Sequence, residues 1–424
     1  MSRINLTRST LGDLPIKIID GDRSAKYPKR DEFQPSGVLF LNTTNIHDDR
    51  FDFSEANYVS DEKFAEIKKG RVERLDIVMT TRGSIGKLAQ FDLPTTALIN
   101  AQMLIVRADG RVLDARFLFH LMRGEDFQSA IRNFASGSAQ PQIPITDLKA
   151  VEIAYPPIES QRRIAYILSA YDDLIENNTR RIKILEGMAQ MLYREWFVNF
   201  RFPGHQKLKL VESELGPIPE GWSLQPLSAL CTKVIDGTHD TPPPLKEGFF
   251  LVTGKHFTSG FVDFDTCYCI SLDEHEKVMK RSKPEPGDIL FSNIGTLGSI
   301  AAVPERPQFS IKNVALFKPL TEALSTFLFV HFGLPETIQM LYAKASGTSQ
   351  KFWSLQFLRT LTIGTPDAAV LADFNRIVKP LVSLRLTLHD QRTNLTRTRD
   401  FLLPKLISGE IPVEAAAELV EQTA

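Results

Sequence analysis

The sequence contains an internal repeat that spans most of its length. Short motifs of the first half return in the second half at an offset of about 210 to 216 residues. Because these pairs keep the same order and nearly the same offset, we infer a duplicated chain with two related halves. The recurring motifs are Ile19-Asp20-Gly21 with Ile235-Asp236-Gly237, Asp76-Ile77 with Asp288-Ile289, Gly83-Ser84-Ile85-Gly86 with Gly295-Thr296-Leu297-Gly298, and Ala135-Ser136-Gly137 with Ala345-Ser346-Gly347.

Each half has the same internal order. It begins with short β-rich runs, such as 37–41 and 75–80, and contains a stretch with helical spacing, such as 115–123. A proline-containing turn then precedes a long amphipathic segment. We therefore predict an α+β fold: two duplicated mixed α/β domains separated by two long antiparallel helices, which form an intramolecular coiled coil with a pseudo-twofold axis.

A chain of 424 residues is too long for one compact core, so several parts are expected. The predicted parts are a first domain at 1–157, a central long helix at 158–200, a linker at 201–217, a second domain at 218–367, a C-terminal long helix at 368–411 and a tail at 412–424.

Both long helices carry a heptad seam of apolar residues, typical of helices that pack on each other. Asn178 and Gln391 occupy equivalent polar slots, where a buried amide would fix the register; alternatively, the amide faces solvent at a loose layer. The predicted seam residues are Ile164, Leu168, Tyr171, Ile175, Asn178 and Ile182 in the first helix, and Ile377, Leu381, Leu384, Leu388, Gln391 and Leu395 in the second.

Composition excludes several classes of protein. Apolar residues make up 43% and charged residues 24%, which is ordinary for a globular chain. The three cysteines lack zinc-site spacing, so we expect reduced thiols and no metal. No apolar run approaches the length of a membrane span and no signal sequence is apparent, so we expect a cytoplasmic protein. The net charge of −1 confines any nucleic-acid surface to a local patch.

Catalytic motifs are missing from the sequence. The run Asp240-Thr-Pro-Pro-Pro244 lacks the aromatic residue and spacing of a methyltransferase motif, Pro366-Asp367 has no Glu-x-Lys downstream, and there is no phosphate-binding P-loop. A pure coiled-coil scaffold remains an alternative, but it explains the helices and not the two duplicated domains. We therefore expect no catalytic site in this chain.

Three segments resemble the specificity subunits of type I restriction-modification systems. They are Tyr193-Arg-Glu-Trp-Phe-Val-Asn-Phe200, Leu215-Gly-Pro-Ile-Pro-Glu-Gly-Trp222 and Leu402-Leu-Pro-Lys-Leu-Ile-Ser-Gly-Glu-Ile411. The resemblance implies a non-catalytic subunit in which each domain is a target-recognition domain that reads one half of a split, asymmetric double-stranded DNA target.

The same resemblance implies the partners: two methyltransferase subunits, which use S-adenosylmethionine, and restriction subunits where these are present. The long helices would be both docking surface and ruler. A helix from 159 to 197 is on the order of 55 Å long, which exceeds one turn of DNA, roughly 34 Å.

Four pairs of polar loops are the candidates for reading DNA, since phosphates need cations and base edges need paired donors and acceptors. For each one, the alternative is a solvated turn whose small polar residues satisfy local backbone groups. The GxxG runs at 83–86 and 295–298 are read as turns. The candidates are Arg23, Lys26, Asn45, Thr80, Thr81, Arg82, Ser84, Ser136, Ser138 and Gln140 in the first half, and Thr238, His239, Lys255, His256, Asn293, Thr296, Thr348, Ser349, Gln350 and Lys351 in the second.

Overall fold

The computed structural model describes residues 5–135, 142–214, 216–258, 260–347, 350–413 and 416. These residues form two compact units. The first unit combines Met1–Asn177 with Arg392–Ala424, and the second is Asn178–Gln391. Each unit therefore contains one half of the repeat and a segment of each long helix. The domain boundaries predicted from sequence stay a prediction.

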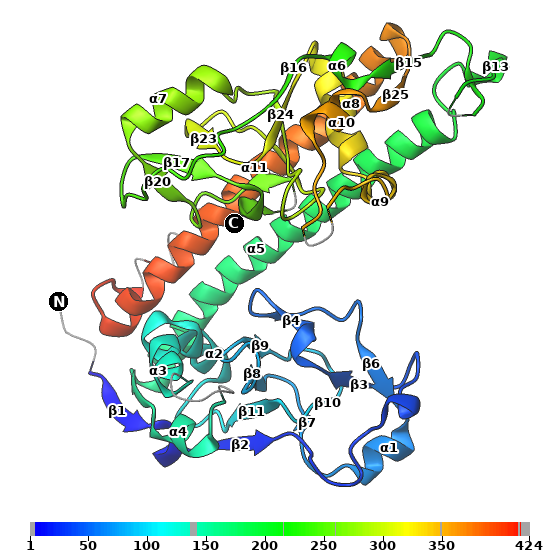
Figure 1. The fold of residues 1–424 in the computed structure, drawn as a ribbon. Helices are drawn as coiled ribbons and strands as arrows, with labels where there is room; N and C mark the ends of the chain where they lie inside the picture. The colour runs from blue at the N-terminus through cyan, green and yellow to red at the C-terminus, as the bar shows by residue number, and fades with distance from the viewer. Residues whose placement is uncertain are drawn as a thin grey trace. The chain divides into compact units, whose positions relative to one another are not determined.

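The first unit contains a mixed α/β domain (Figure 1). Its strands are β1 (Thr7–Thr10), β2 (Ile16–Asp20), β3 (Val38–Leu41), β4 (Ile46–His47), β5 (Arg50–Phe51), β6 (Asn57–Val59), β7 (Arg71–Val72), β8 (Ile77–Thr80), β9 (Leu88–Gln90), β10 (Ala97–Ile99), β11 (Met103–Ala108) and β12 (Glu152–Tyr155). Its helices are α1 (Asp61–Glu66), α2 (Ala115–Arg123), α3 (Glu125–Ala135), α4 (Ile145–Ala150) and the first part of α5 (Ile158–Tyr193).

Two four-stranded sheets form the body of this domain. One has the order β2-β11-β8-β9 and is antiparallel, while the other has the order β6-β3-β10-β7 with β3 and β10 parallel. Successive side chains of a strand point to opposite faces. In β8, Ile77 and Met79 pack toward the helices, whereas Val78 packs toward the other sheet. The continuous apolar run of this strand follows from burial on both faces.

The second unit contains a related set of elements, with an additional strand pair, β13 and β14, and with no described counterpart of β7. Its strands are β13 (Leu210–Val211), β14 (Ile218–Pro219), β15 (Ser223–Pro226), β16 (Cys231–Asp236), β17 (Phe249–Val252), β18 (Phe257–Thr258), β19 (Phe261–Val262), β20 (Tyr268–Ile270), β21 (Ile289–Phe291), β22 (Ile300–Ala302), β23 (Phe309–Ile311), β24 (Ala315–Pro319) and β25 (Thr362–Thr365). Its helices are α6 (Leu227–Leu230), α7 (Leu272–Arg281), α8 (Glu322–Phe332), α9 (Pro335–Tyr342), α10 (Leu355–Arg359) and the first part of α11 (Ala368–Ser408).

The topology of the first unit recurs in the second. The sheet β16-β24-β21-β22 repeats β2-β11-β8-β9, and β20-β17-β23 repeats β6-β3-β10, including its parallel pair. A strand pair joins the two ends of each domain, β1 with β12 and β15 with β25. The predicted duplication of a mixed α/β domain is confirmed at the level of strand order.

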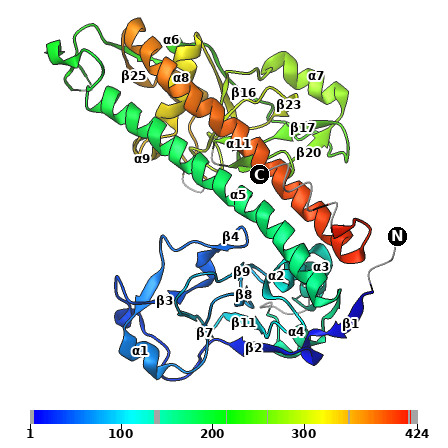
Figure 2. The same ribbon diagram turned by 180° about the vertical axis from the view of Figure 1, so that it is seen from behind.

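The predicted long antiparallel helices are confirmed as α5 and α11, and α5 continues into a π-helical turn at Arg194–Val198. In the first unit, Asp172 of α5 meets Arg399 of α11. In the second unit, Ile182 packs with Leu388 and Trp196 with Phe374. In the second unit, residues later along α5 and its π-helical turn thus meet residues earlier in α11, and in each unit the two segments lie side by side in both views (Figures 1 and 2).

In α5, the predicted seam residues lie inside. Ile164, Leu168, Tyr171, Asn178 and Ile182 are buried, and Ile175 is half-buried.

The predicted seam of α11 is wrong at alternate positions, at two of which the neighbouring residue is buried instead. Ile377, Leu384 and Gln391 are exposed, Leu381 and Leu395 are half-buried, and Leu388 is buried. The neighbouring positions Val378 and Arg385 are buried instead. At position 385 the physical reason is that an arginine can pack its aliphatic stem against apolar neighbours while its guanidinium pairs with Glu186 of α5.

Two further findings concern expectations made from composition. Cys231, Cys267 and Cys269 are free, and burial raises the pKa of Cys231 and Cys267 to about 12. Among the helices that the structure describes, none is both long and apolar enough to cross a membrane.

Candidate nucleic-acid interface

In the first unit, the predicted loop after β8 meets the segment that begins at Gln142, just beyond the predicted loop at 136–140, which lies outside the described residues. Arg82, in the turn after β8, pairs with the backbone of Gln142, and its Nε donates to Oε1 of that residue at 3.1 Å. The backbone nitrogen of Ile143 donates to the carbonyl of Thr81 at 3.1 Å. The segment after β8 and the segment before α4 therefore form one surface, although about 60 residues separate them in sequence.

The turn at 100–102 connects this surface to the other loops. The backbone nitrogen and the hydroxyl of Thr81 both donate to the carbonyl of Gln102. The amide of Asn100 lies 3.4 Å from Oδ1 of Asn42, and Arg23 Nη2 donates to the carbonyl of Ala101 at 3.2 Å. Three of the predicted loops of the first half, those that contain Arg23, Asn42 and Thr81, thus adjoin one turn between β10 and β11.

The second unit brings the equivalent loops together in the same way. Ile294 pairs with Phe352, the backbone nitrogen of Trp353 donates to the carbonyl of Asn293, and the side-chain amide of Asn293 donates to the carbonyl of Trp353. Gly254 approaches the same loop so closely that an added Cβ would lie 2.1 Å from the hydroxyl of Ser292.

A central turn is present here too, between β23 and β24. Oδ1 of Asn313 lies 2.9 Å from Nδ1 of His239, and its backbone nitrogen donates to the carbonyl of Thr238. The neighbouring Lys312 contacts the hydroxyl of Thr241 through its ammonium group. The two units therefore present matching sets of polar loops.

Most of the described candidates are accessible on these surfaces. Lys351 also lies over the exposed ring of Tyr342, with its ammonium 4.7 Å from the ring centre. Such cations and amides are the groups that contact phosphates and base edges. The exposed candidates are Arg23, Lys26, Arg82, Ser84, His239, Lys255, Thr296, Gln350 and Lys351, and Thr238 is half-buried.

The structure corrects five candidates, whose side chains are buried: Asn45, Thr80, Thr81, His256 and Asn293. Their polar groups bond within the domain. Asn45 and His256 close equivalent 3₁₀ turns, each accepting a backbone N–H three residues earlier. Burial also lowers the pKa of His256, an effect to which Lys255 adds, so this ring carries no charge for a phosphate near neutral pH.

Five candidates lie outside the described residues: Ser136, Ser138, Gln140, Thr348 and Ser349. Conversely, the sequence interpretation missed Gln102, Gln142 and Lys312, which lie on the surfaces just described. The sequence repeat could have identified Gln102 and Lys312, because Asn100 recurs as Asn313 in the turns that contain them.

Comparison with known proteins identifies the family. Residues 8–186 match the family model described as type I restriction modification DNA specificity domain. A Mycoplasma pneumoniae protein, named as the C-terminus of a type I specificity subunit, is 32% identical over 150 residues, which cover 34% of this chain and 94% of that relative. The chain belongs to the type I restriction-modification specificity subunits.

Other members of this family match over more of the chain. The type I restriction enzyme MjaIX specificity subunit of Methanocaldococcus jannaschii is 28% identical over 346 residues, covering 80% of this chain and 78% of the relative. The crystal structure of a type I system S subunit from M. genitalium matches with a TM-score of 0.59 and 18% identity, covering 95% of this chain and 96% of that chain. The specificity-subunit fold therefore extends over both units.

Proposed function

We propose that this specificity subunit selects the DNA target of a type I complex, with each recognition domain reading one half of a split, asymmetric site. The observation that carries the proposal is the convergence of matching polar loops in both units, centred on Gln102 and on Lys312. Side chains with paired donors and acceptors read base edges, and cations bind phosphates. Two similar but non-identical loop sets suit two different half-sites. The chain itself contributes specificity and no catalysis.

Two methyltransferase subunits are the partners that we propose for the long helices. On α5, Ile184, Met188 and Met191 are 55%, 45% and 64% exposed and follow helical spacing. Phe401 of α11, which corresponds to Met188 in the repeat, is 60% exposed. Exposed apolar side chains at equivalent places suit two copies of one partner.

Within the complex, the methyltransferase subunits would use S-adenosylmethionine to methylate adenines that are rotated out of the base stack. Restriction subunits join where the system encodes them, and we propose the cytoplasm as the location. The near-neutral net charge of −1 implies that the isolated chain binds DNA weakly and depends on these partners.

The test is to express this chain with the methyltransferase subunit of its own system, purify the complex and map methylated adenines in genomic DNA. We expect co-purification and one split motif. Methylation by this chain without the partner, or methylation without any common motif, contradicts the proposal.

Arg82→Ala sharpens the test. Arg82 is exposed among the converging loops, and loss of one specific base or phosphate contact is expected to lower the methylation rate roughly tenfold. Arg74→Ala is the control, because it removes the same charge from the same domain at a site where the guanidinium pairs with Asp92 at 2.7 Å. Equal effects of the two substitutions would show that Arg82 acts only through net charge.

A further inference from the structure

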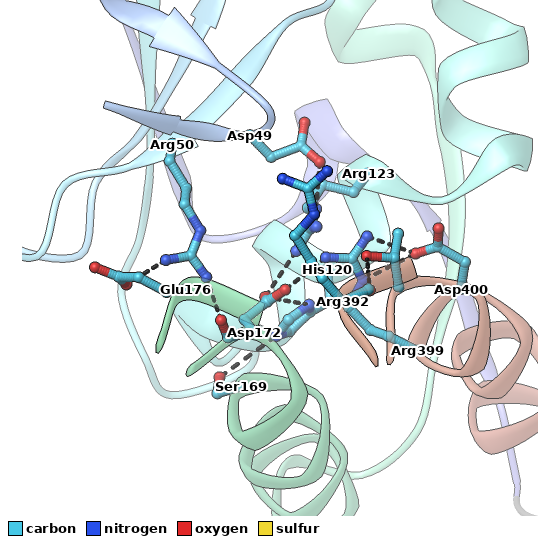
Figure 3. Close-up of polar contacts among 11 residues, drawn as sticks. Asp49, Arg50, His120, Arg123, Ser169, Asp172, Glu176, Arg392, Arg399 and Asp400 are labelled. Atoms are coloured by element: carbon cyan, nitrogen blue, oxygen red, sulfur yellow. Dashed lines mark hydrogen bonds and ion pairs between the residues drawn. The ribbon is translucent and has the colours of Figure 1, made fainter. Parts of the chain in front are cut away.

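A cluster of charged side chains surrounds Asp172 of α5 in the first unit. Its carboxylate is 15% exposed and accepts hydrogen bonds from Nη1 of Arg123 at 2.8 Å and from Nη1 of Arg399 at 2.6 Å. Arg123 belongs to α2 of the recognition domain and Arg399 to α11 (Figure 3). One carboxylate thus joins the recognition domain to both long helices.

The hairpin β4–β5 completes this cluster from the recognition domain. Oδ2 of Asp49 accepts from Nε of Arg123 at 2.9 Å. Arg50 forms an ion pair with Glu176 and also donates to the backbone carbonyl of Asp172, so it grips α5 at two points (Figure 3). The hairpin is therefore attached by charged groups to α2 and to α5.

The conformation of the hairpin tip supports a specific role for Asp49. Its φ is 61°, in the left-handed region that glycine adopts without strain. The corresponding residue of the second unit is Gly260, with a φ of 86°. The first unit therefore keeps an aspartate where glycine would be easier, and its carboxylate binds Arg123.

The cluster fixes the relative orientation of the elements that it joins more than it adds to the free energy of unfolding. Burial alone would raise the pKa of Asp172, but the charges of Arg123 and Arg399 more than offset it and hold the pKa below its usual value. A buried ion pair gains little net free energy because its charges lose their hydration. Its hydrogen bonds are nevertheless directional, whereas the apolar contacts of the surrounding core are not.

The second unit attaches its equivalent hairpin, β18–β19, by other means. Phe261 stands at the place of Arg50 and stacks on His389 of α11, with ring centres 3.9 Å apart. The guanidinium of Arg385 lies 5.3 Å from the Phe261 ring centre and pairs with Glu186 at 3.3 Å.

The repeat relates these contacts to those of the first unit. By sequence offset, Arg385 corresponds to Asp172 and Glu186 to Arg399, so the interhelical ion pair is present in both units with its charges exchanged. In both units the hairpin is thus attached to the long helices, although different types of residue make the contact. Preservation of the contact rather than of the residues indicates that the position of the hairpin matters.

Each hairpin follows directly on a 3₁₀ turn that adjoins the candidate DNA-reading loops. In the first unit, the 3₁₀ turn at Thr43–Asn45 runs into β4 at Ile46; in the second, the turn at Gly254–His256 runs into β18 at Phe257. A displacement of the hairpin on the helices therefore moves the adjoining loop.

We propose that Asp49, Arg50 and Asp172 form a lock that fixes the orientation of the first recognition domain on the long helices. This orientation sets the spacer length at which the domain can bind its half-site. They are positioning residues, and none of them needs to touch DNA. The inference rests on the proposed function.

The test uses the complex of this chain with its methyltransferase subunit. The lock variant Asp49→Asn/Arg50→Gln removes one negative and one positive charge, keeps both side chains polar and leaves the net charge unchanged. The control Arg74→Gln/Asp92→Asn makes the same change of charge at an exposed site of the same domain, where Asp92 binds both Arg74 and Arg116. Thermal unfolding of both variants establishes that they fold.

Two measurements follow. The first is amide hydrogen exchange of residues 42–51, and the second is methylation of duplexes whose spacer is cognate, one base pair shorter or one base pair longer. For the lock variant we expect faster exchange and roughly tenfold weaker discrimination between spacers, with the half-site sequences unchanged. For the control we expect neither change.

The outcomes separate the two proposals. Unchanged exchange in the lock variant overturns the lock, and so does faster exchange with undiminished spacer discrimination. Failure of the unsubstituted complex to methylate a split motif refutes the proposed function instead.

Discussion

At the scale of single residues, two histidines, one in α2 and one in α8, are buried in neutral form. Burial lowers the pKa of His120 to about 3 and that of His331 to about 4. His331 shares a hydrogen bond of 2.7 Å with the hydroxyl of Tyr193, and His120 lies 3.8 Å from Asp172. Each ring lies beside α5 and carries no positive charge in the folded protein near neutral pH.

This burial predicts a pH-dependent stability. The folded-state pKa of His331 lies below the ordinary value of about 6.5, so the unfolded chain takes up a proton first as the pH falls. The contribution of neutral His331 to the free energy of unfolding is fully present above pH 6.5 and is lost as the pH falls from about 6.5 to about 4. His331→Gln should reduce the slope of unfolding free energy against pH in this window by up to about 1.4 kcal/mol per pH unit.

Urea unfolding between pH 4.5 and 7.5 measures this slope. His47→Gln, which replaces an exposed histidine, should leave it as in the unsubstituted chain. An equal slope for His331→Gln and the unsubstituted chain would mean that His331 titrates normally in the folded state.

Glycines explain part of the sequence repeat without invoking DNA. A Cβ on Gly21 would lie 2.2 Å from the carbonyl oxygen of Asn100, and one on Gly237 would lie 2.0 Å from that of Ile311. Only glycine permits this approach of two backbone segments. Recurrence of the Ile-Asp-Gly motif therefore reflects a packing requirement, which the sequence alone did not distinguish from a shared binding role.

At the scale of elements, periodicity predicted α5 and α11 well, because each burial stripe extends over many turns. In α11 it identified Leu388, which is buried, but misplaced the alternate seam positions Ile377, Leu384 and Gln391, which are exposed. The more apolar track contains Ile377 and Leu384, but the buried track contains Val378 and Arg385. The burial of Arg385 depends on Glu186 of α5, which lies about 200 residues away in sequence, so no local pattern contains it.

Adjacent substitutions in α11 test this correction. Val378 is fully buried in the core of the second unit, whereas Ile377 is 36% exposed. Val378→Ala should lower the free energy of unfolding by about 2 kcal/mol through loss of buried contacts. Ile377→Ala should change it by less than about 1 kcal/mol. A larger loss for Ile377→Ala in denaturant unfolding would restore the seam predicted from sequence.

In the candidate interface, too, the sequence predicted some features correctly and missed others. Local sequence identified exposed residues such as Arg82 and Lys255, because turn composition marks surface loops. It could not show that Asn45 and His256 close turns inside the domain. It also missed the Asp172 cluster, whose members come from four separate stretches of the chain.

At the scale of the whole molecule, the paired helices suggest how a spacer could be altered. Since α5 and α11 pair within both units, a heptad inserted into one helix alone would shift one partner against the other. Matched insertions after Asn177 and after Gln391 keep the pairing within each unit. Seven residues add about 10.5 Å of helix, equivalent to about three base pairs at 3.4 Å each.

For the double insertion we expect a motif with the same half-sites and a spacer about three base pairs longer, read by methylation mapping of the purified complex. For a single insertion in either helix we expect loss of methylation. An unchanged spacer in the double insertion would show that the helices do not act as the ruler.

The first unit combines two segments that are far apart in the sequence, and this affects the order in which the chain can fold during translation. Its core includes Leu402, Leu403 and Leu406, which pack against Ile164 and Leu168. The ribosome therefore completes the N-terminal recognition domain long before it supplies the segment that covers this domain's share of α5. The second unit, by contrast, is one uninterrupted stretch. The first unit therefore cannot complete its core before Leu402, Leu403 and Leu406 have been synthesised, and an apolar face of α5 stays uncovered until then.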